Sequence, residues 1–197
     1  MKKLLTMLGM LGILTLSAAA ADQENQVPNE DEKMAESIYE FKLKDIQGKE
    51  TELDTYKGKV LLIMNTASKC GLTPQYEEMV KLQDQYDPKE FQVLAFPSND
   101  FGKQEPGTNE EILEFCQTNY NVDFPIFGKV KVLQSEEQEP LFTYLTTAEN
   151  PDFTGDIGWN FEKFLIGKDG KLIRRFRSKT SPLDENVVNA INQALGK

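Results

Sequence analysis

Two segments of the chain are mainly apolar over the length of a β-strand, and the first has an unbroken apolar centre at Val60 to Met64. Residues 59–67 read KVLLIMNTA, and residues 91–96 read FQVLAF. A continuous apolar run is typical of a strand that is covered on both faces, whereas a half-exposed strand alternates apolar and polar positions. The pattern therefore predicts two buried strands of an α/β sheet, with the strand at 59–67 in the middle of the sheet.

A helix is predicted after the first of these strands. Thr73 is suited to the N-cap and Pro74 to the first helical position. Apolar residues then recur at helical spacing up to about residue 86: Tyr76, Met79, Val80 and Tyr86.

A second helix is predicted after the strand at 91–96 and a long loop. Thr108 and Glu111 have the spacing of a capping box, which favours a helix start at this point. The helix should continue to about residue 120, with an apolar stripe formed by Ile112, Phe115, Cys116 and Tyr120.

The remaining patterns complete one α/β domain. They predict a hairpin at 39–44 and 50–53 turned at Gln47-Gly48, a short helix at 140–145, strands at 161–166 and 171–176, and a closing helix at 182–195. Strand-helix-strand-helix followed by a hairpin and a helix is the thioredoxin-like arrangement. We expect a thioredoxin-like fold with a central mixed β-sheet flanked by helices and an N-terminal β-hairpin.

The first 36 residues have a different character. Lys2 and Lys3, an apolar stretch over 4–16 and the small residues Ala19 to Ala21 predict a signal peptide over 1–21. That stretch is too short to span a bilayer, so no stable membrane insertion is expected after cleavage. Residues 22–36 are acidic and lack an apolar pattern, which predicts a flexible linker before a domain at 37–197. The protein is expected to be exported, either periplasmic or secreted.

Composition excludes several kinds of chemistry. The formal net charge is −10, which argues against a nucleic-acid partner. The chain has no histidine, so catalysis by Ser-His-Asp or Cys-His groups and histidine-ligated metals are excluded. No cofactor or metal is expected.

Cys70 follows the first central strand and precedes a predicted helix, a position where open α/β sheets place ligands. Lys69 and the helix dipole would favour its thiolate. The residue three positions later is Thr73, so a Cys-x-x-Cys dithiol is absent and a single activated thiolate would act, for example on a peroxide. Cys70 could equally be an ordinary buried thiol, or one half of a fixed disulfide with Cys116.

Three segments carry a resemblance to a known family. NTASKCGLTPQYEEM, LAFPSNDFGKQEPGTNEEI and GWNFEKFLIGKDGKLIRRF resemble, in order and spacing, the signature blocks of the glutathione peroxidase family. The resemblance covers roughly residues 37–196. It implies a thioredoxin-like fold and a thiol peroxidase that reduces hydrogen peroxide and organic or lipid hydroperoxides.

The resemblance also implies site residues. Cys70 takes the position of the peroxidatic cysteine or selenocysteine, and the other tetrad positions are taken by Gln104, Trp159 and Asn160. Amide and indole N–H groups are neutral donors that can stabilise a thiolate or a departing peroxide oxygen. Without the resemblance, Trp159 would be read as a core residue, Gln104 as a solvated turn residue and Asn160 as the start of a strand.

Cys116 is the remaining thiol. Where the family commonly reads FPCNQFG this chain reads FPSNDFG, so Ser98 removes one candidate partner for Cys70 and Asp100 replaces a glutamine. EFCQTNYNVDFPIF is similar to the segment in which thioredoxin-using members keep their resolving cysteine. The resemblance thus implies that Cys116 resolves a Cys70 sulfenic acid, although its place on the apolar stripe also suits a core residue.

The resemblance further implies a thioredoxin-type reductant or glutathione as partner, with a dithiol protein favoured because the site has cysteine. The short segment TTAENPDFTGDIG is similar to that of monomeric members, so a monomer is expected. Two other classes stay open: a non-enzymatic peroxide sensor that relays oxidation to a partner protein, and a structural exported domain with a fixed disulfide.

Overall fold

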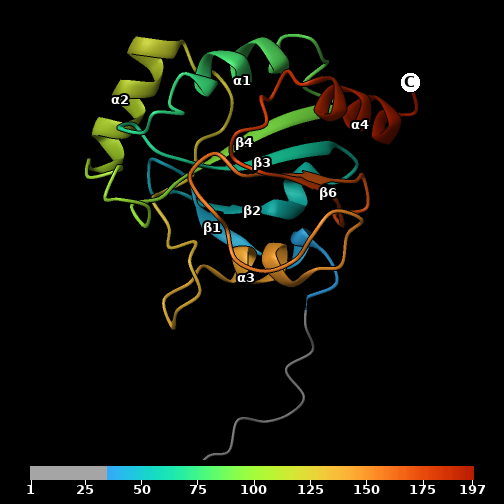
Figure 1. Ribbon diagram of the computed structural model, residues 1–197, viewed down its shortest axis with the longest axis horizontal. Helices are drawn as coiled ribbons and strands as arrows, with labels where there is room; N and C mark the ends of the chain where they lie inside the picture. Colours follow the sequence, from blue (N-terminus) through green and yellow to red (C-terminus); the bar gives the residue numbers. More distant parts are fainter. Residues whose placement is uncertain (1–34) are drawn as a thin grey trace, which may run out of the picture. The chain divides into compact units, whose positions relative to one another are not determined.

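A four-stranded mixed sheet lies at the centre of the computed structural model, which describes residues 35–197 (Figure 1). Its strand order is β4-β3-β5-β6. β3 pairs in parallel with β4, whereas β5 is antiparallel to both β3 and β6. The strands are β3 (Val60–Thr66), β4 (Phe91–Pro97), β5 (Lys163–Ile166) and β6 (Leu172–Phe176). The predicted α/β class and mixed sheet are confirmed.

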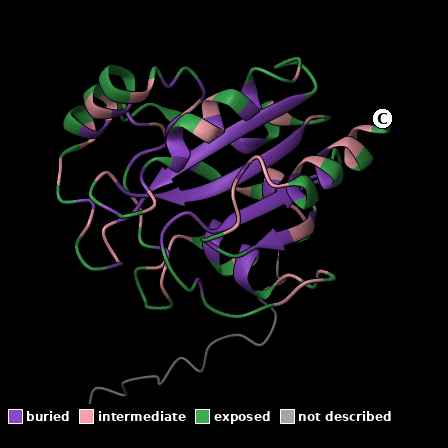
Figure 2. Cartoon of the chain, turned by 45° about the horizontal axis from the view of Figure 1, so that its top comes forward, coloured by how far each residue is buried: buried purple, intermediate pink, exposed green. Residues whose placement is uncertain are grey.

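Both faces of the sheet are covered, as the apolar runs predict. On β3, Val60, Leu62 and Met64 belong to one apolar cluster. Leu61 and Ile63 belong to a second cluster on the opposite face. Figure 2 shows the central strands buried along their length. Alternate residues of one strand therefore supply two separate cores.

Helices occupy both sides of the sheet. The cluster of Val60 and Leu62 also takes in apolar residues of α1 (Gln75–Gln83), α2 (Asn109–Tyr120) and α4 (Glu185–Leu195). The other cluster takes in α3 (Pro140–Thr147), Leu43 of the hairpin β1 (Lys42–Lys44) and β2 (Glu50–Glu52), and the 3₁₀ turns η1 (Ile38–Glu40) and η2 (Leu53–Tyr56). Figure 1 shows this layering, with α1 and α4 on one side of the sheet and α3 on the other.

Several element boundaries differ from the prediction. β5 begins at Lys163 rather than at 161, and α4 begins at Glu185 rather than at 182. Two further differences involve polar side chains. Tyr39 is not in a strand, because Ser37 and Glu40 form a capping box that closes a 3₁₀ turn there. Thr73 is not the N-cap of α1, which begins at Gln75 without a side-chain cap. The Thr73 hydroxyl instead accepts a hydrogen bond from the Cys70 amide at 3.0 Å and donates to the Ala67 carbonyl at 2.8 Å. Its polar group is therefore committed to the cysteine turn.

The predicted signal peptide and nearly all of the predicted linker lie outside the described residues. Residues 35–197 fall within a single compact unit. Within this range, no helix is long and apolar enough to cross a membrane.

Candidate active site

Cys70 lies in the turn that joins the carboxyl end of β3 to α1. Its side chain is 8% exposed. The Leu72 amide donates a hydrogen bond to the Cys70 sulfur at 3.4 Å, and the Thr73 hydroxyl fixes the Cys70 backbone. A backbone N–H directed at sulfur stabilises a thiolate more than a thiol, because the charged form is the stronger acceptor.

Gln104 and Asn160 meet at this turn although 56 residues separate them. The Asn160 amide group donates to the Gln104 side-chain oxygen at 3.0 Å. The Lys69 amide donates to the Gln104 carbonyl at 3.0 Å, which joins the Gln104 loop to the residue before Cys70. The Gln104 side-chain oxygen is thus occupied, whereas its NH₂ group donates no hydrogen bond within residues 35–197 and keeps its capacity as a donor.

Asn160 also carries an unused acceptor. Its side chain is fully buried, and its Oδ1 atom has no hydrogen-bond partner among residues 35–197. A buried polar atom without a partner costs free energy. Asn160 therefore has the capacity to accept one further hydrogen bond.

Trp159 is the large hydrophobic residue that the described structure leaves exposed, at 40%. Its ring lies 5.4 Å from that of Phe101, centroid to centroid. Its carbonyl accepts hydrogen bonds from the Asn65 amide group at 3.2 Å and the Ser178 hydroxyl at 3.1 Å. Trp159 is therefore not a core residue, since its backbone is fixed while its ring faces solvent.

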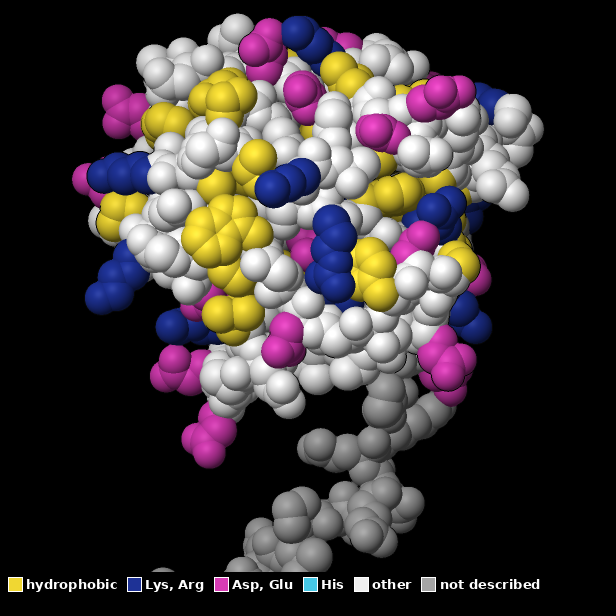
Figure 3. Space-filling model, in the orientation of Figure 1, with side chains coloured by type: hydrophobic (Ala, Val, Ile, Leu, Met, Phe, Trp, Pro, Cys, Tyr) yellow, Lys and Arg dark blue, Asp and Glu magenta, His cyan; other side chains and the backbone are white. Residues whose placement is uncertain are grey.

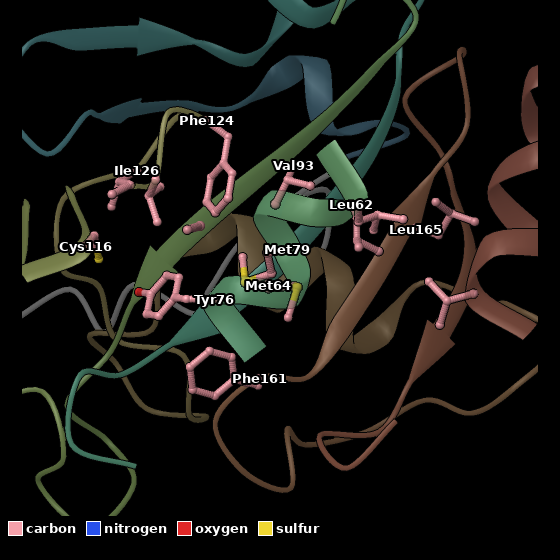
Figure 4. Close-up of a cluster of buried hydrophobic side chains, with 14 of the residues drawn as sticks. Leu62, Met64, Tyr76, Met79, Val93, Cys116, Phe124, Ile126, Phe161 and Leu165 are labelled. Carbon is pink, nitrogen blue, oxygen red and sulfur yellow. The ribbon is translucent and has the colours of Figure 1, made fainter. Parts of the chain in front are cut away.

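Cys116 lies on α2 and is completely buried, in the same apolar cluster as Cys70. Burial raises the pKa of the Cys116 thiol to about 11; Glu105 adds to this rise and the Tyr76 hydroxyl opposes it. Figure 4 shows the Tyr76 hydroxyl pointing toward Cys116. Both cysteines are free thiols in the structure, so it holds no Cys70–Cys116 disulfide.

A cavity of about 380 Å³ separates the segments that carry the two thiols. Ser68 and Lys69 line it from the cysteine turn, and Ile112 and Phe115 line it from α2. Glu105 also lines it, and its buried carboxylate accepts hydrogen bonds from the Ser68 amide and hydroxyl at 2.9 and 3.1 Å. Burial raises the pKa of Glu105.

The molecular surface carries charges of both signs (Figure 3). On the face drawn in Figure 3, basic and acidic side chains are interspersed with apolar groups rather than gathered into a basic stripe. Within residues 35–197, no group of three or more His, Cys, Asp or Glu side chains could hold a metal ion.

Asn65 was not singled out by the sequence analysis, yet it holds the Trp159 segment. In addition to its bond to Trp159, its Oδ1 accepts from the Glu162 amide at 3.0 Å, and its carbonyl accepts from the Phe161 amide at 2.6 Å. The available signal was an asparagine near the end of the otherwise apolar run KVLLIMNTA. A buried polar side chain in a central strand needs partners, and here the partners are in the site.

A thioredoxin-like sheet with a single cysteine at the carboxyl end of a central strand defines a class of thiol-dependent redox enzymes. The family model of glutathione peroxidase matches residues 38–146. The glutathione peroxidase homolog BsaA of Halalkalibacterium halodurans is 54% identical over 147 residues, which cover 75% of this chain and 93% of that protein. The chain belongs to the glutathione peroxidase family, and it is a peroxidase.

Further comparisons agree with this assignment. The thioredoxin/glutathione peroxidase BtuE of Escherichia coli is 44% identical, covering 83% of this chain and all of that protein. The crystal structure of T. cruzi GPX1 is similar at a TM-score of 0.66 and 33% identity, covering 81% of this chain and 97% of that one. The thioredoxin-like fold is confirmed, and membership of this family supports thiol peroxidase activity.

Proposed function

We propose that Cys70 is the peroxidatic nucleophile of this enzyme and acts on hydrogen peroxide and organic or lipid hydroperoxides. The Cys70 thiolate attacks the terminal peroxide oxygen, the O–O bond breaks, and a proton passes to the departing oxygen. The products are a Cys70 sulfenic acid and water or an alcohol. The attacking sulfur is oxidised and the peroxide is reduced.

One observation carries this proposal: the hydrogen bond between Gln104 and Asn160, formed beside the turn that holds Cys70. It brings together three segments that are distant in sequence. The Gln104 NH₂ group and the Trp159 indole N–H are donors suited to a thiolate and to a departing oxygen. The vacant Asn160 Oδ1 acceptor is suited to the O–H of the peroxide or of the sulfenic acid.

We further propose that Cys116 resolves the sulfenic acid. Its thiol displaces hydroxide from Cys70, the thiol proton leaves with that group as water, and a Cys70–Cys116 disulfide forms. A thioredoxin-type dithiol, or glutathione, then reduces this disulfide and is itself oxidised. Because Cys116 is buried with a raised pKa, α2 has to open before it reacts.

Two expectations about the chain as a whole stand as proposals. Export rests on the N-terminal pattern of charged, apolar and small residues, and N-terminal sequencing of the protein recovered from the periplasm or medium tests it. The monomeric state rests on the short segment TTAENPDFTGDIG, and sedimentation equilibrium tests it.

The experiment for the proposed function compares peroxides and reductants side by side. Steady-state reduction of hydrogen peroxide and a lipid hydroperoxide is measured with a thioredoxin system and with a glutathione system, for the wild type and Cys70→Ser. We expect turnover in the wild type, faster with thioredoxin, and none in the variant. Wild-type activity in Cys70→Ser would refute the role of Cys70, and stoichiometric oxidation without turnover would favour a sensor.

A further inference from the structure

Lys163 is a completely buried lysine at the first position of β5. Its ammonium group donates to the Gln75 side-chain oxygen at 2.6 Å, to the Phe161 carbonyl at 2.6 Å and to the Ser178 carbonyl at 3.0 Å. An ammonium has three N–H donors, so all three are used. None of the three acceptors is a carboxylate, so the group is held by hydrogen bonds rather than by a direct ion pair.

The three acceptors belong to different parts of the site. Gln75 is the first residue of α1, five positions after Cys70. Phe161 directly follows Asn160. Ser178 lies beyond β6, and its hydroxyl donates to the Trp159 carbonyl. The Gln75 amide group also donates to the Ser178 carbonyl at 2.8 Å, which closes the arrangement.

Strand register explains why Lys163 reaches these groups. Lys163 pairs with Met64 of β3 and with Phe176 of β6. Because β5 is antiparallel to β3, its first residue lies at the sheet end where β3 finishes and Cys70 follows. The buried ammonium is therefore at the same end of the sheet as the proposed tetrad.

The peptide that Lys163 binds has an unusual conformation. Phe161 has a φ of +67°, in the left-handed region that non-glycine residues seldom adopt. Its amide donates to the Asn65 carbonyl and its carbonyl accepts from Lys163, so both sides of the residue are fixed. Its ring packs edge-on against Tyr76 of α1, 5.6 Å between centroids. This conformation lets the ring enter the core while the preceding Asn160 faces Gln104.

An apolar residue could fill a buried strand position without the desolvation cost of an ammonium group. Burial indeed lowers the pKa of Lys163 to about 7, against the opposing effect of Glu78 on α1 and Glu162 on the Trp159 segment. An ionisable amino group is therefore present at this position despite the cost of burying it. The contacts that it makes are with the segments that carry the site.

We propose that Lys163 is a positioning residue for the peroxide reaction, whose ammonium group holds the Trp159–Asn160 segment against the turn that carries Cys70. The inference rests on the proposed roles of Cys70, Trp159 and Asn160. It predicts that the loss of Lys163 slows the reaction of Cys70 with peroxide even when the protein stays folded.

The test uses Lys163→Met, which keeps a side chain of similar length but removes the three N–H donors. Lys49→Met, at an exposed position, is the matched control. Stopped-flow measurements give the second-order rate constant of reduced enzyme with hydrogen peroxide. Acrylamide quenching of the fluorescence of Trp159, the single tryptophan, reports on the segment itself. We expect the rate constant to fall at least fivefold and quenching to increase in Lys163→Met, with neither change in Lys49→Met.

A purely structural role gives a different result. Lys163→Met would then melt at a lower temperature but react with peroxide at 25 °C within fivefold of the wild-type rate. That result would overturn the proposal. If Lys163→Met does not fold, Gln75→Met decides, because it removes one acceptor and leaves the lysine. A rate reduced at least twofold in Gln75→Met supports the proposal, and a smaller change overturns it. Failure of the underlying function is recognised separately, since wild-type Cys70 would then not react with peroxide.

Discussion

Removing the helix cap of α2 should accelerate disulfide formation. The Thr108 hydroxyl accepts a hydrogen bond from the Glu111 amide at 3.3 Å, and the Glu111 carboxylate accepts from the Thr108 amide at 2.8 Å. Thr108→Ala removes the first of these bonds, at a cost of about 1 kcal/mol to the helix. If α2 has to open before Cys116 reacts, opening becomes about fivefold more favourable, because each 1.4 kcal/mol is a factor of ten.

The raised pKa of Cys116 is the reason to expect that the closed state does not react. Its value of about 11, against an ordinary 9.0, leaves about 100-fold less thiolate at neutral pH. The thiolate is the attacking form, so a closed α2 withholds both access and ionisation. Opening removes the burial that causes the shift, and the opened population therefore sets the rate.

The assay is a single turnover. Reduced enzyme receives one equivalent of hydrogen peroxide, samples are quenched with acid and alkylated, and the intramolecular disulfide is quantified by mass spectrometry. We expect the disulfide to form about fivefold faster in Thr108→Ala than in the wild type, and the loss of the Cys70 thiol itself to proceed at the same rate.

Asp184→Ala is the matched control. Asp184 caps α4, where its carboxylate accepts from the Asn186 amide at 2.9 Å, so the variant loses a comparable bond on a helix without a thiol. It should leave the rate of disulfide formation unchanged. Equal rates in the wild type and Thr108→Ala would refute opening of α2 as the limiting step, and equal acceleration in both variants would indicate a global effect instead.

Three further predictions concern the site and its support. Gln104→Ala should slow the peroxide step about 10- to 100-fold in stopped-flow measurements, since a hydrogen bond to a charged group contributes about 1.5–3 kcal/mol; an unchanged rate constant would mean that Gln104 does not act on the sulfur. Glu162→Gln should lower the free energy of unfolding in urea by about 3 kcal/mol, because it leaves the buried Arg175 guanidinium, 2.8 Å away, without its carboxylate. The folded-state pKa of Lys163, about 7, lies below its ordinary 10.5, so between these pH values the unfolded chain binds more protons and the free energy of unfolding rises with pH. From pH 7.5 to 9.5, the difference in free energy of unfolding between wild type and Lys163→Met should shift by about 2 kcal/mol in favour of the wild type. A constant difference would contradict the lowered pKa.

Strands β3 and β4 were predictable because their sequences are mainly apolar. KVLLIMNTA and FQVLAF leave few alternatives to a strand buried on both faces, and the structure places them as neighbours in parallel. Helix α2 was predictable from its capping box, which the structure contains. In each case a local signal determines the element, so neighbouring residues were sufficient to recognise it.

Two of the errors arose where a polar side chain had two competing partners. Thr73 has the composition of an N-cap, but its hydroxyl binds the Cys70 turn and α1 begins two residues later. Tyr39 fits an alternating strand pattern, but the Ser37–Glu40 capping box closes a 3₁₀ turn over it. Both outcomes depend on which nearby hydrogen bond is formed, and apolar periodicity carries no information on that choice.

The buried charges were beyond prediction for a different reason. Lys163 and Arg175 lie in segments that read as ordinary strands, FEKFLI and KLIRRF, and the sequence alone suggests exposed positions for them. Their partners come from other elements: Gln75 lies 88 residues from Lys163, and Gly155 lies 20 residues from Arg175. Only the assembled sheet end shows that these side chains are enclosed and satisfied.

The two thiols therefore depend on opposite kinds of surroundings. Buried polar groups lie at the sheet end around Cys70, among them Asn65 and Lys163. Each needs hydrogen-bond partners, and residues of the site segments provide them. The requirement that stabilises the core thus also fixes the loops, because freeing a loop would leave a buried polar group unsatisfied. Among the described residues, Cys116 makes no hydrogen bond to the loops of the site. It lies in an apolar cluster with the Tyr76 hydroxyl directed toward it (Figure 4). Cys116 can leave when α2 opens without disturbing those loops, whereas the Cys70 turn cannot move alone. The resolving step should therefore displace α2 and leave the peroxidatic site in place.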